Sequence, residues 1–261
     1  MIKGEKQKTA ITKVYEAILQ ENLVDVCFLK GSIARGEDDE FSDVDFYCLV
    51  SNEKYDKFLE RRIKYLKSYK SILHTEHVNF VCPQIICIYE DGLHFDLYTT
   101  TLNKLNYDDQ IKVLYDPQDL LSSYQSNKLK LQPQDVANIV HELSFSILEF
   151  YQAFSRKDDV WALRLAHYIF GYYTNLIRYF IEPEKSKIPV KGFKKITNYE
   201  NYKKYQDICK ALTYSTSLLA VQMIVIEVDN LVMQLPIKVA EYLNIDFFLY
   251  CKNLIFKIKG V

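Results

Sequence analysis

Residues 24–50 read VDVCFLKGSIARGEDDEFSDVDFYCLV, and this stretch decides the fold. The β-branched and apolar run over 24–29 is typical of a buried strand, and the Gly31-Ser32 dipeptide after it predicts a tight turn. A second apolar run over 44–50 predicts another strand. The segment therefore predicts a strand, a turn, a short acidic connection and a second strand.

The predicted turn has the chemistry of an anion-binding site. Gly31 has no Cβ, so backbone N–H groups can approach an anion closely there. Ser32 adds a hydroxyl, and we expect it to cap a short helix whose N-terminus favours phosphate. Because a Gly-Ser dipeptide alone is usually only a turn, its interpretation as a phosphate site depends on the residues that follow.

About ten residues after the turn, a pair of acidic residues begins the second predicted strand. Six of the nine residues over 37–45 are carboxylates, and Asp43 and Asp45 flank Val44 at the start of the second strand. Side chains two positions apart in a strand point to the same face, and two carboxylates on one face repel unless a cation lies between them. Mg²⁺ favours one or two carboxylates together with substrate phosphates. Asp96, which alternates with apolar neighbours in a later strand, is the candidate third acid, the alternative being a strand-end carboxylate without function.

Together these motifs resemble the polymerase-β-like nucleotidyltransferase superfamily, whose signature is an apolar strand, Gly-Ser, an acidic pair and a third acid on a later strand. The sequences GSIARG at 31–36 and SDVD at 42–45 are similar to those of small bacterial antibiotic nucleotidyltransferases. In overall plan the chain resembles the lincosamide type, and more distantly the aminoglycoside adenylyltransferases. The motif likeness covers 24–50 and, more weakly, 93–98.

The resemblance implies an Mg²⁺-dependent enzyme that moves a nucleoside monophosphate from a nucleoside triphosphate, by first expectation AMP from ATP. The acceptor would be a hydroxyl of a small molecule such as a lincosamide or aminoglycoside antibiotic, so the implied role is antibiotic resistance. The resemblance implies nucleotide-phosphate binding by Gly31 and Ser32, and Arg35 is a further candidate for the same role. It also implies that the catalytic acids, which would hold two Mg²⁺ ions, are Asp43, Asp45 and Asp96.

The sequence leaves two possible roles open for each of the two cations beside the turn, Arg35 and Lys30. Arg35 either neutralises phosphate or pairs with the carboxylates of 37–40. Lys30 departs from the family pattern, in which an aromatic or apolar residue is common at this position. It either contacts phosphate or extends its aliphatic stem along apolar surface, so we leave it out of the predicted core site.

The remaining sequence predicts an α+β fold in two domains. Apolar periodicity predicts helices over 9–20 and 53–69, and further strands over 78–82, 85–89, 93–99 and 111–115. It then predicts helices over 133–155, 158–180, 213–233 and 237–258, with a lysine-rich connector over 185–204. We expect a nucleotidyltransferase domain with a small mixed sheet flanked by helices over 1–120, a linker over 121–131, and a helical, substrate-binding bundle over 132–261.

Other candidate residues have weaker support. Glu142, Ser146 and Glu149 form a stripe on the first predicted helix of the second domain. A carboxylate there could bind a cationic acceptor or act as the general base in place of Asp96, and a solvated polar face is the alternative. His94 and His141 have no supporting spacing, so we interpret both as structural.

Composition limits the partners. With 33 basic and 34 acidic residues the net charge is −1, and we expect no nucleic-acid partner. The six cysteines form no CxxC pair, which indicates reduced thiols. Without an N-terminal apolar segment or a membrane-spanning stretch, we expect a cytoplasmic protein with no membrane partner. A homodimer is left open.

Two alternative functions also remain open at this point. One is nucleotidylation of a protein or RNA, as in toxin–antitoxin transferases, although the near-neutral charge argues against RNA. The other is a catalytically silent nucleotide-binding regulator, which the crowding of three acids disfavours.

Overall fold

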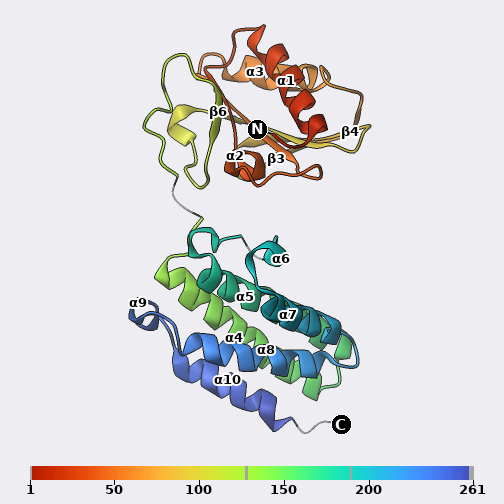
Figure 1. The fold of residues 1–261 in the computed structure, drawn as a ribbon, viewed down its shortest axis with the longest axis vertical. Helices are drawn as coiled ribbons and strands as arrows, with labels where there is room; N and C mark the ends of the chain where they lie inside the picture. Colours follow the sequence, from red (N-terminus) through yellow and green to blue (C-terminus); the bar gives the residue numbers. More distant parts are fainter. Residues whose placement is uncertain (1, 127–128, 189, 259–261) are drawn as a thin grey trace. The chain divides into compact units, whose positions relative to one another are not determined.

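The computed structural model describes residues 2–126, 129–188 and 190–258. The chain folds as two compact units, 1–128 and 129–261 (Figure 1). The division lies within 121–131, where the sequence predicts a linker. Each unit has its own hydrophobic core.

The first unit is built on a six-stranded mixed sheet with the strand order β3-β4-β5-β2-β1-β6. The strands are β1 (Val26–Leu29), β2 (Val44–Leu49), β3 (Ile72–Asn79), β4 (Pro83–Tyr89), β5 (His94–Thr100) and β6 (Lys112–Tyr115). β2 and β5 pair in parallel, whereas the other described pairings are antiparallel. The predicted small mixed sheet is confirmed.

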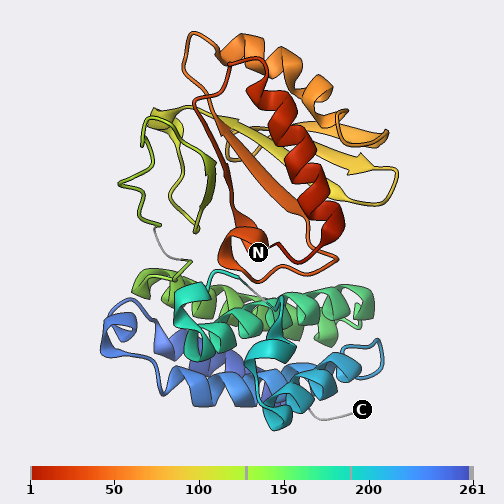
Figure 2. The ribbon, with the colours of Figure 1, turned by 45° about the horizontal axis from the view of Figure 1, so that its top comes forward.

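Helices α1 (Glu5–Leu19) and α3 (Tyr55–Leu66) cover one face of this sheet (Figure 2). The apolar faces of both helices share a core with the inward side chains of the strands, including Phe46 and Phe95. Because successive strand residues point to opposite faces, Asp45 and Tyr47 lie on the other face. There Tyr47 packs in a smaller core with residues of the segment after β5, such as Leu105.

The sequence misplaced one strand. A strand was predicted over 78–82, but β3 spans Ile72–Asn79 and residues 80–82 form the connection to β4. β3 is an edge strand, and most of its side chains, such as Glu76 and His77, are exposed. Edge strands carry charged and polar residues, so the apolar periodicity that reveals a buried strand is weak here.

The second unit is helical, as predicted. Its elements are α4 (Pro133–Ser155), α5 (Asp159–Ile181), the 3₁₀ turn η2 (Pro183–Lys185), α6 (Phe193–Ile196), α7 (Tyr199–Ala211), α8 (Ser217–Val232), α9 (Ile237–Ala240) and α10 (Ile245–Lys257). α4 packs against α5 and α10, and α5 packs against α8. Within the described ranges, no helix combines the length and apolar character that crossing a bilayer requires.

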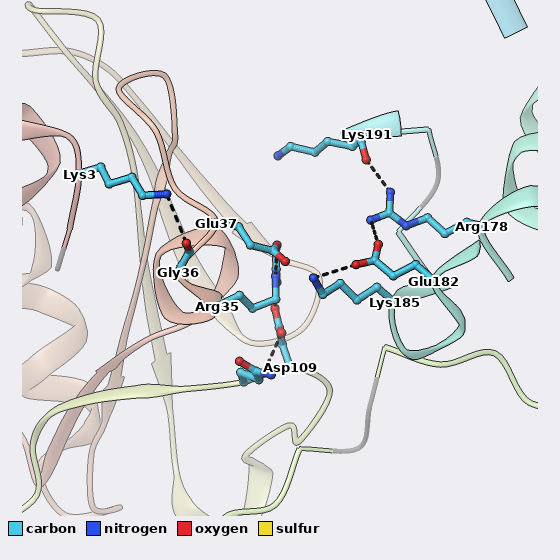
Figure 3. Close-up of polar contacts among 10 residues, drawn as sticks. Lys3, Arg35, Gly36, Glu37, Asp109, Arg178, Glu182, Lys185 and Lys191 are labelled. Atoms are coloured by element: carbon cyan, nitrogen blue, oxygen red, sulfur yellow. Dashed lines mark hydrogen bonds and ion pairs between the residues drawn. The ribbon is translucent and has the colours of Figure 1, made fainter. Parts of the chain in front are cut away.

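Polar capping explains two departures from the predicted helices. The single helix expected over 237–258 is two helices, because the side chain of Asn244 accepts a hydrogen bond from Phe247 N and starts α10 there. The connector expected over 185–204 already contains the start of α7, where Asn198 caps the helix in the same way. Arg178, near the end of α5, holds part of this connector by donating to Lys191 O at 2.6 Å and to Glu182 at 2.7 Å (Figure 3).

Candidate active site

The two strongest candidate acids lie side by side on neighbouring strands. In the parallel register of β2 and β5, Asp45 is the partner of Asp96. Asp43 precedes β2 and lies two positions from Asp45, on the strand extension that leads into the sheet. The structure therefore brings the three sequence-predicted acids to one place, on the face of the sheet opposite α1 and α3.

The raised pKa of Asp45 reflects its burial beside two other carboxylates. Burial first, and then the carboxylates of Asp43 and Asp96, together raise the pKa of Asp45 to about 6. His94 and Arg35 oppose this rise but do not cancel it. Crowded carboxylates of this kind are stabilised in their ionised form by a nearby cation.

The carboxylate of Asp96 is contacted by one residue of its own strand, His94, and by one of the neighbouring strand β4, Gln84. His94 Nε2 lies 2.9 Å from Oδ1 of Asp96. Burial raises the pKa of Asp96, whereas His94 and the hydrogen bond from Gln84 act against that rise. The side chain is therefore fixed in orientation, and His94, which we had interpreted as structural, contacts a candidate catalytic acid directly.

The Gly31-Ser32 turn contacts Asp45. Gly31 has a φ of +67°, and a Cβ at this position would overlap Oδ2 of Asp45. Lys30 N also donates to Asp45 O at 3.1 Å. Glycine is required at this position both by the left-handed backbone and by the close approach of the carboxylate.

The helix after the turn, α2 (Gly31–Arg35), begins two residues earlier than a cap at Ser32 would place it. Lys30 is its N-cap residue and makes no side-chain cap, so the prediction that Ser32 caps this helix was wrong. The reason is that the positive φ of Gly31 already turns the chain into the helix, which places Ser32 within the first turn. The Ser32 side chain is half-buried there.

Both cations next to the turn are held by carboxylates. The buried Lys30 donates through Nζ to Asn106 O at 2.6 Å and to Asp108 Oδ1 at 2.7 Å. Arg35 donates through Nε to Glu37 at 2.9 Å and through Nη1 to Asp109, so it lies between two acids (Figure 3). The alternative in which Arg35 pairs with the acidic connection is therefore observed.

Sequence reasoning missed Asp108 and Asp109. They lie in an irregular segment between the 3₁₀ turn η1 (Leu102–Lys104) and β6, where no periodicity marks them. The only available signal was a pair of adjacent acids beside the last predicted strand.

The donor chemistry fits Mg²⁺ shared with a substrate rather than a metal held by protein alone. Among the described residues, no group of three or more His, Cys, Asp or Glu forms a metal-binding set. The carboxylates of Asp43, Asp45 and Asp96 nevertheless supply the oxygen ligands that Mg²⁺ prefers, and Mg²⁺ commonly completes its shell with substrate phosphates and water. Burial and then the neighbouring carboxylates raise the pKa of Asp45, and a cation bound beside it would offset both effects.

The candidates on α4 do not form one uniform face. Glu142 is exposed, Glu149 is half-buried and Ser146 is buried, so the predicted polar stripe is interrupted at its centre. His141 Nε2 accepts a hydrogen bond from Asn244 N at 2.9 Å, which links α4 to the start of α10. This contact agrees with the structural interpretation of His141.

Comparisons with known proteins bear on the first unit of the chain. Residues 11–105 match the family model described as "Nucleotidyltransferase domain". No curated protein matches the chain. One similar solved structure is an aminoglycoside 6-adenyltransferase from Bacillus subtilis, at 12% sequence identity and a TM-score of 0.39, covering 97% of this chain and 99% of that chain. A likeness this low carries no conclusion about function. The family match agrees with the resemblance seen in the sequence: residues 11–105 match a nucleotidyltransferase domain.

Proposed function

We propose that the protein transfers a nucleoside monophosphate, AMP from ATP in the simplest case, to a hydroxyl of a small molecule in an Mg²⁺-dependent reaction. One observation carries this proposal. Asp45 lies beside Asp96 in parallel strands, and its carboxylate touches the Gly31 turn. A phosphate-binding turn in contact with crowded acids is an arrangement that suits a metal-bound nucleotide.

Each residue of the site has a role in the proposed reaction. The backbone at Gly31 and the hydroxyl of Ser32 bind the triphosphate, and Asp43 and Asp45 hold Mg²⁺ together with it. Asp96 is either a third ligand, which would allow two ions, or the base for the acceptor hydroxyl. When bound, Mg²⁺ supplies neutralisation of the phosphate charge and activation of the attacking oxygen.

The proton of the acceptor hydroxyl also needs a destination. Asp96 is buried and its pKa is raised, so it can accept a proton more readily than an exposed aspartate. His94 lies 2.9 Å from its carboxylate and keeps that carboxylate oriented. Where Asp96 is the base, it takes the proton as the acceptor oxygen bonds to the α-phosphorus, and the bond from that phosphorus to pyrophosphate breaks, so that pyrophosphate leaves from the Gly31-Ser32 turn.

We assign acceptor binding to the helical unit, residues 129–261. It folds around a core of its own, and the nucleotidyltransferase match ends before it begins. The motif forms at 31–36 and 42–45 favour an antibiotic of the lincosamide or aminoglycoside type as the acceptor, and hence a cytoplasmic role in resistance. Glu142 and Glu149 are the candidate contacts for a cationic acceptor.

A panel experiment tests the proposal. The protein is incubated with Mg²⁺, ATP or another nucleoside triphosphate, and lincosamides or aminoglycosides, while pyrophosphate release and the mass of each drug are measured. Pyrophosphate release with an added nucleotide mass on one drug supports the proposal. The same mass on a protein or RNA target supports nucleotidylation of a macromolecule instead. Nucleotide binding without pyrophosphate release under any condition would identify a silent regulator.

A further inference from the structure

The segment Asn106-Tyr107-Asp108-Asp109-Gln110, which we call the acidic loop, reaches both cations beside the phosphate-binding turn. Asp108 accepts from Lys30 at 2.7 Å, and Asp109 accepts from Arg35. Lys30 immediately precedes Gly31, and Arg35 ends the short helix α2 that begins there. The acidic loop therefore holds two positive charges that flank the proposed triphosphate site in the sequence.

These ion pairs lie where an unpaired charge is costly. The side chains of Lys30 and Arg35 are 6% and 14% exposed, and that of Asp109 is 13% exposed. A buried charge without a counter-charge destabilises the fold, so each cation needs an anion whether or not a nucleotide is present. In the structure the acidic loop supplies that anion.

The acidic loop itself is weakly packed. Four of its five residues are exposed, Asp109 being the half-buried one. Tyr124 makes two contacts with the loop. Its hydroxyl donates to the main-chain oxygen of Asp109 at 2.7 Å, and its ring stacks on the ring of Tyr107, with the ring centroids 4.9 Å apart. Exposed segments with few buried apolar contacts open at a low free-energy cost. The loop can therefore leave the cations without disrupting the core of the unit.

The charge balance favours an exchange of partners. Arg35 pairs with two carboxylates, Glu37 and Asp109, so its positive charge is already matched before any nucleotide arrives. A triphosphate at the Gly31-Ser32 turn brings further negative charge to the same cations, and like charges at close range repel. If the triphosphate binds Arg35, Asp109 must therefore move away from Arg35.

We propose that the acidic loop is a stand-in anion for the substrate: Asp109, and with it Asp108, holds Arg35 and Lys30 in the free protein, and a nucleoside triphosphate takes over these cations and displaces the loop. This inference rests on the proposed function, because it assumes that a nucleotide binds at the Gly31-Ser32 turn. It assigns Asp109 an influence on nucleotide affinity that acts through Arg35.

Hydrogen–deuterium exchange of the wild-type protein tests the displacement. The probe is a non-hydrolysable ATP analogue with Mg²⁺, at a concentration that saturates binding by calorimetry. Amides over 106–110 are expected to exchange faster when the analogue is bound, while those of β2 are expected to exchange no faster. Unchanged or slower exchange over 106–110 in the bound protein would overturn the proposal. Absence of calorimetric binding by the wild type would instead refute the proposed function, and this inference with it.

A variant tests the competition. Asp109→Asn removes the competing charge but keeps the size of the side chain, and it is expected to bind the analogue about fivefold more tightly or better. A purely structural role for Asp109 predicts equal or weaker binding. The matched control is Glu60→Gln, which removes the same charge from the exposed side of α3 and is expected to leave the affinity unchanged. If Asp109→Asn fails to show a cooperative thermal transition, the exchange experiment on the wild type decides alone.

Discussion

A Cβ on Gly31 would overlap Oδ2 of Asp45 and lie 3.2 Å from its Cγ. The phosphate-binding turn and the metal-binding acid of the proposed site are thus in direct contact, and neither can be changed without affecting the other. The φ of +67° at Gly31 adds a backbone requirement at the same position.

Gly31→Ala is expected to reduce transfer about 100-fold or more, because the new methyl group must push the Asp45 carboxylate out of place. Gly36→Ala is the matched control: Gly36 has a φ of +72°, but no described atom lies within 4 Å of its Cβ position. Both variants should lose about 1–2 kcal/mol of stability through the left-handed backbone. Steady-state kinetics and thermal unfolding check this, and similar activity losses in both variants would contradict it.

Asp45→Asn is expected to stabilise the metal-free protein at neutral and higher pH. The pKa of Asp45 in the folded state is about 6 against 3.8 for an ordinary aspartate, so ionisation opposes folding. This cost is fully present above pH 6, where it amounts to at most about 3 kcal/mol, and disappears as the pH falls towards 4. Urea unfolding in EDTA at pH 4.5 and pH 8, with Glu60→Gln as the surface control, measures it. A stability gain that is equal at both pH values would show that the charge of Asp45 is not the cause.

Asp43→Asn and Asp45→Asn should each reduce kcat below a tenth of the wild-type value while the fold remains intact. Each removes a carboxylate proposed to hold Mg²⁺, and in the free protein the loss mainly relieves repulsion. Circular dichroism verifies the fold, and pyrophosphate release measures kcat. Activity above that limit in either variant would remove the residue from the proposed metal site.

Glu142→Gln and Glu149→Gln test the assignment of the acceptor to the helical unit. If α4 binds a cationic acceptor, each variant should raise the KM for the acceptor, and the affinity for nucleotide should barely change. The half-buried Glu149 is expected to show the larger effect, because its charge is less screened by solvent than that of the exposed Glu142. Normal acceptor kinetics in both variants would direct the search to the helix that carries Trp161 and Tyr173.

The parts of the fold that the sequence predicted well are those fixed by local pattern. Strand β2 and the turn at Gly31 follow from a short apolar run and a glycine, and helix α4 begins at Pro133 as predicted. The parallel pairing of β2 with β5 sets Asp96 beside Asp45. The alternation around Asp96 indicates only that its side chain points away from its apolar neighbours.

The parts that the sequence could not predict depend on contacts between distant segments or on capping. Asp108 and Asp109 form ion pairs with Lys30 and Arg35, which lie far away in the sequence. The residues around the two acids do not indicate these pairings. The edge strand β3 was misplaced because its exposed residues carry little apolar signal. The break before α10 depends on a single asparagine cap at Asn244.

The parallel joint between β2 and β5 also has a consequence for the order of assembly. Helix α3 and strands β3 and β4 lie between β2 and β5 in the sequence, so Asp45 and Asp96 meet through a long-range closure. Long-range pairings form late in folding because the entropy of loop closure is lost before the contacts are gained. We therefore expect the two acids to meet only after the local pairings of β3 with β4 and of β4 with β5 have formed.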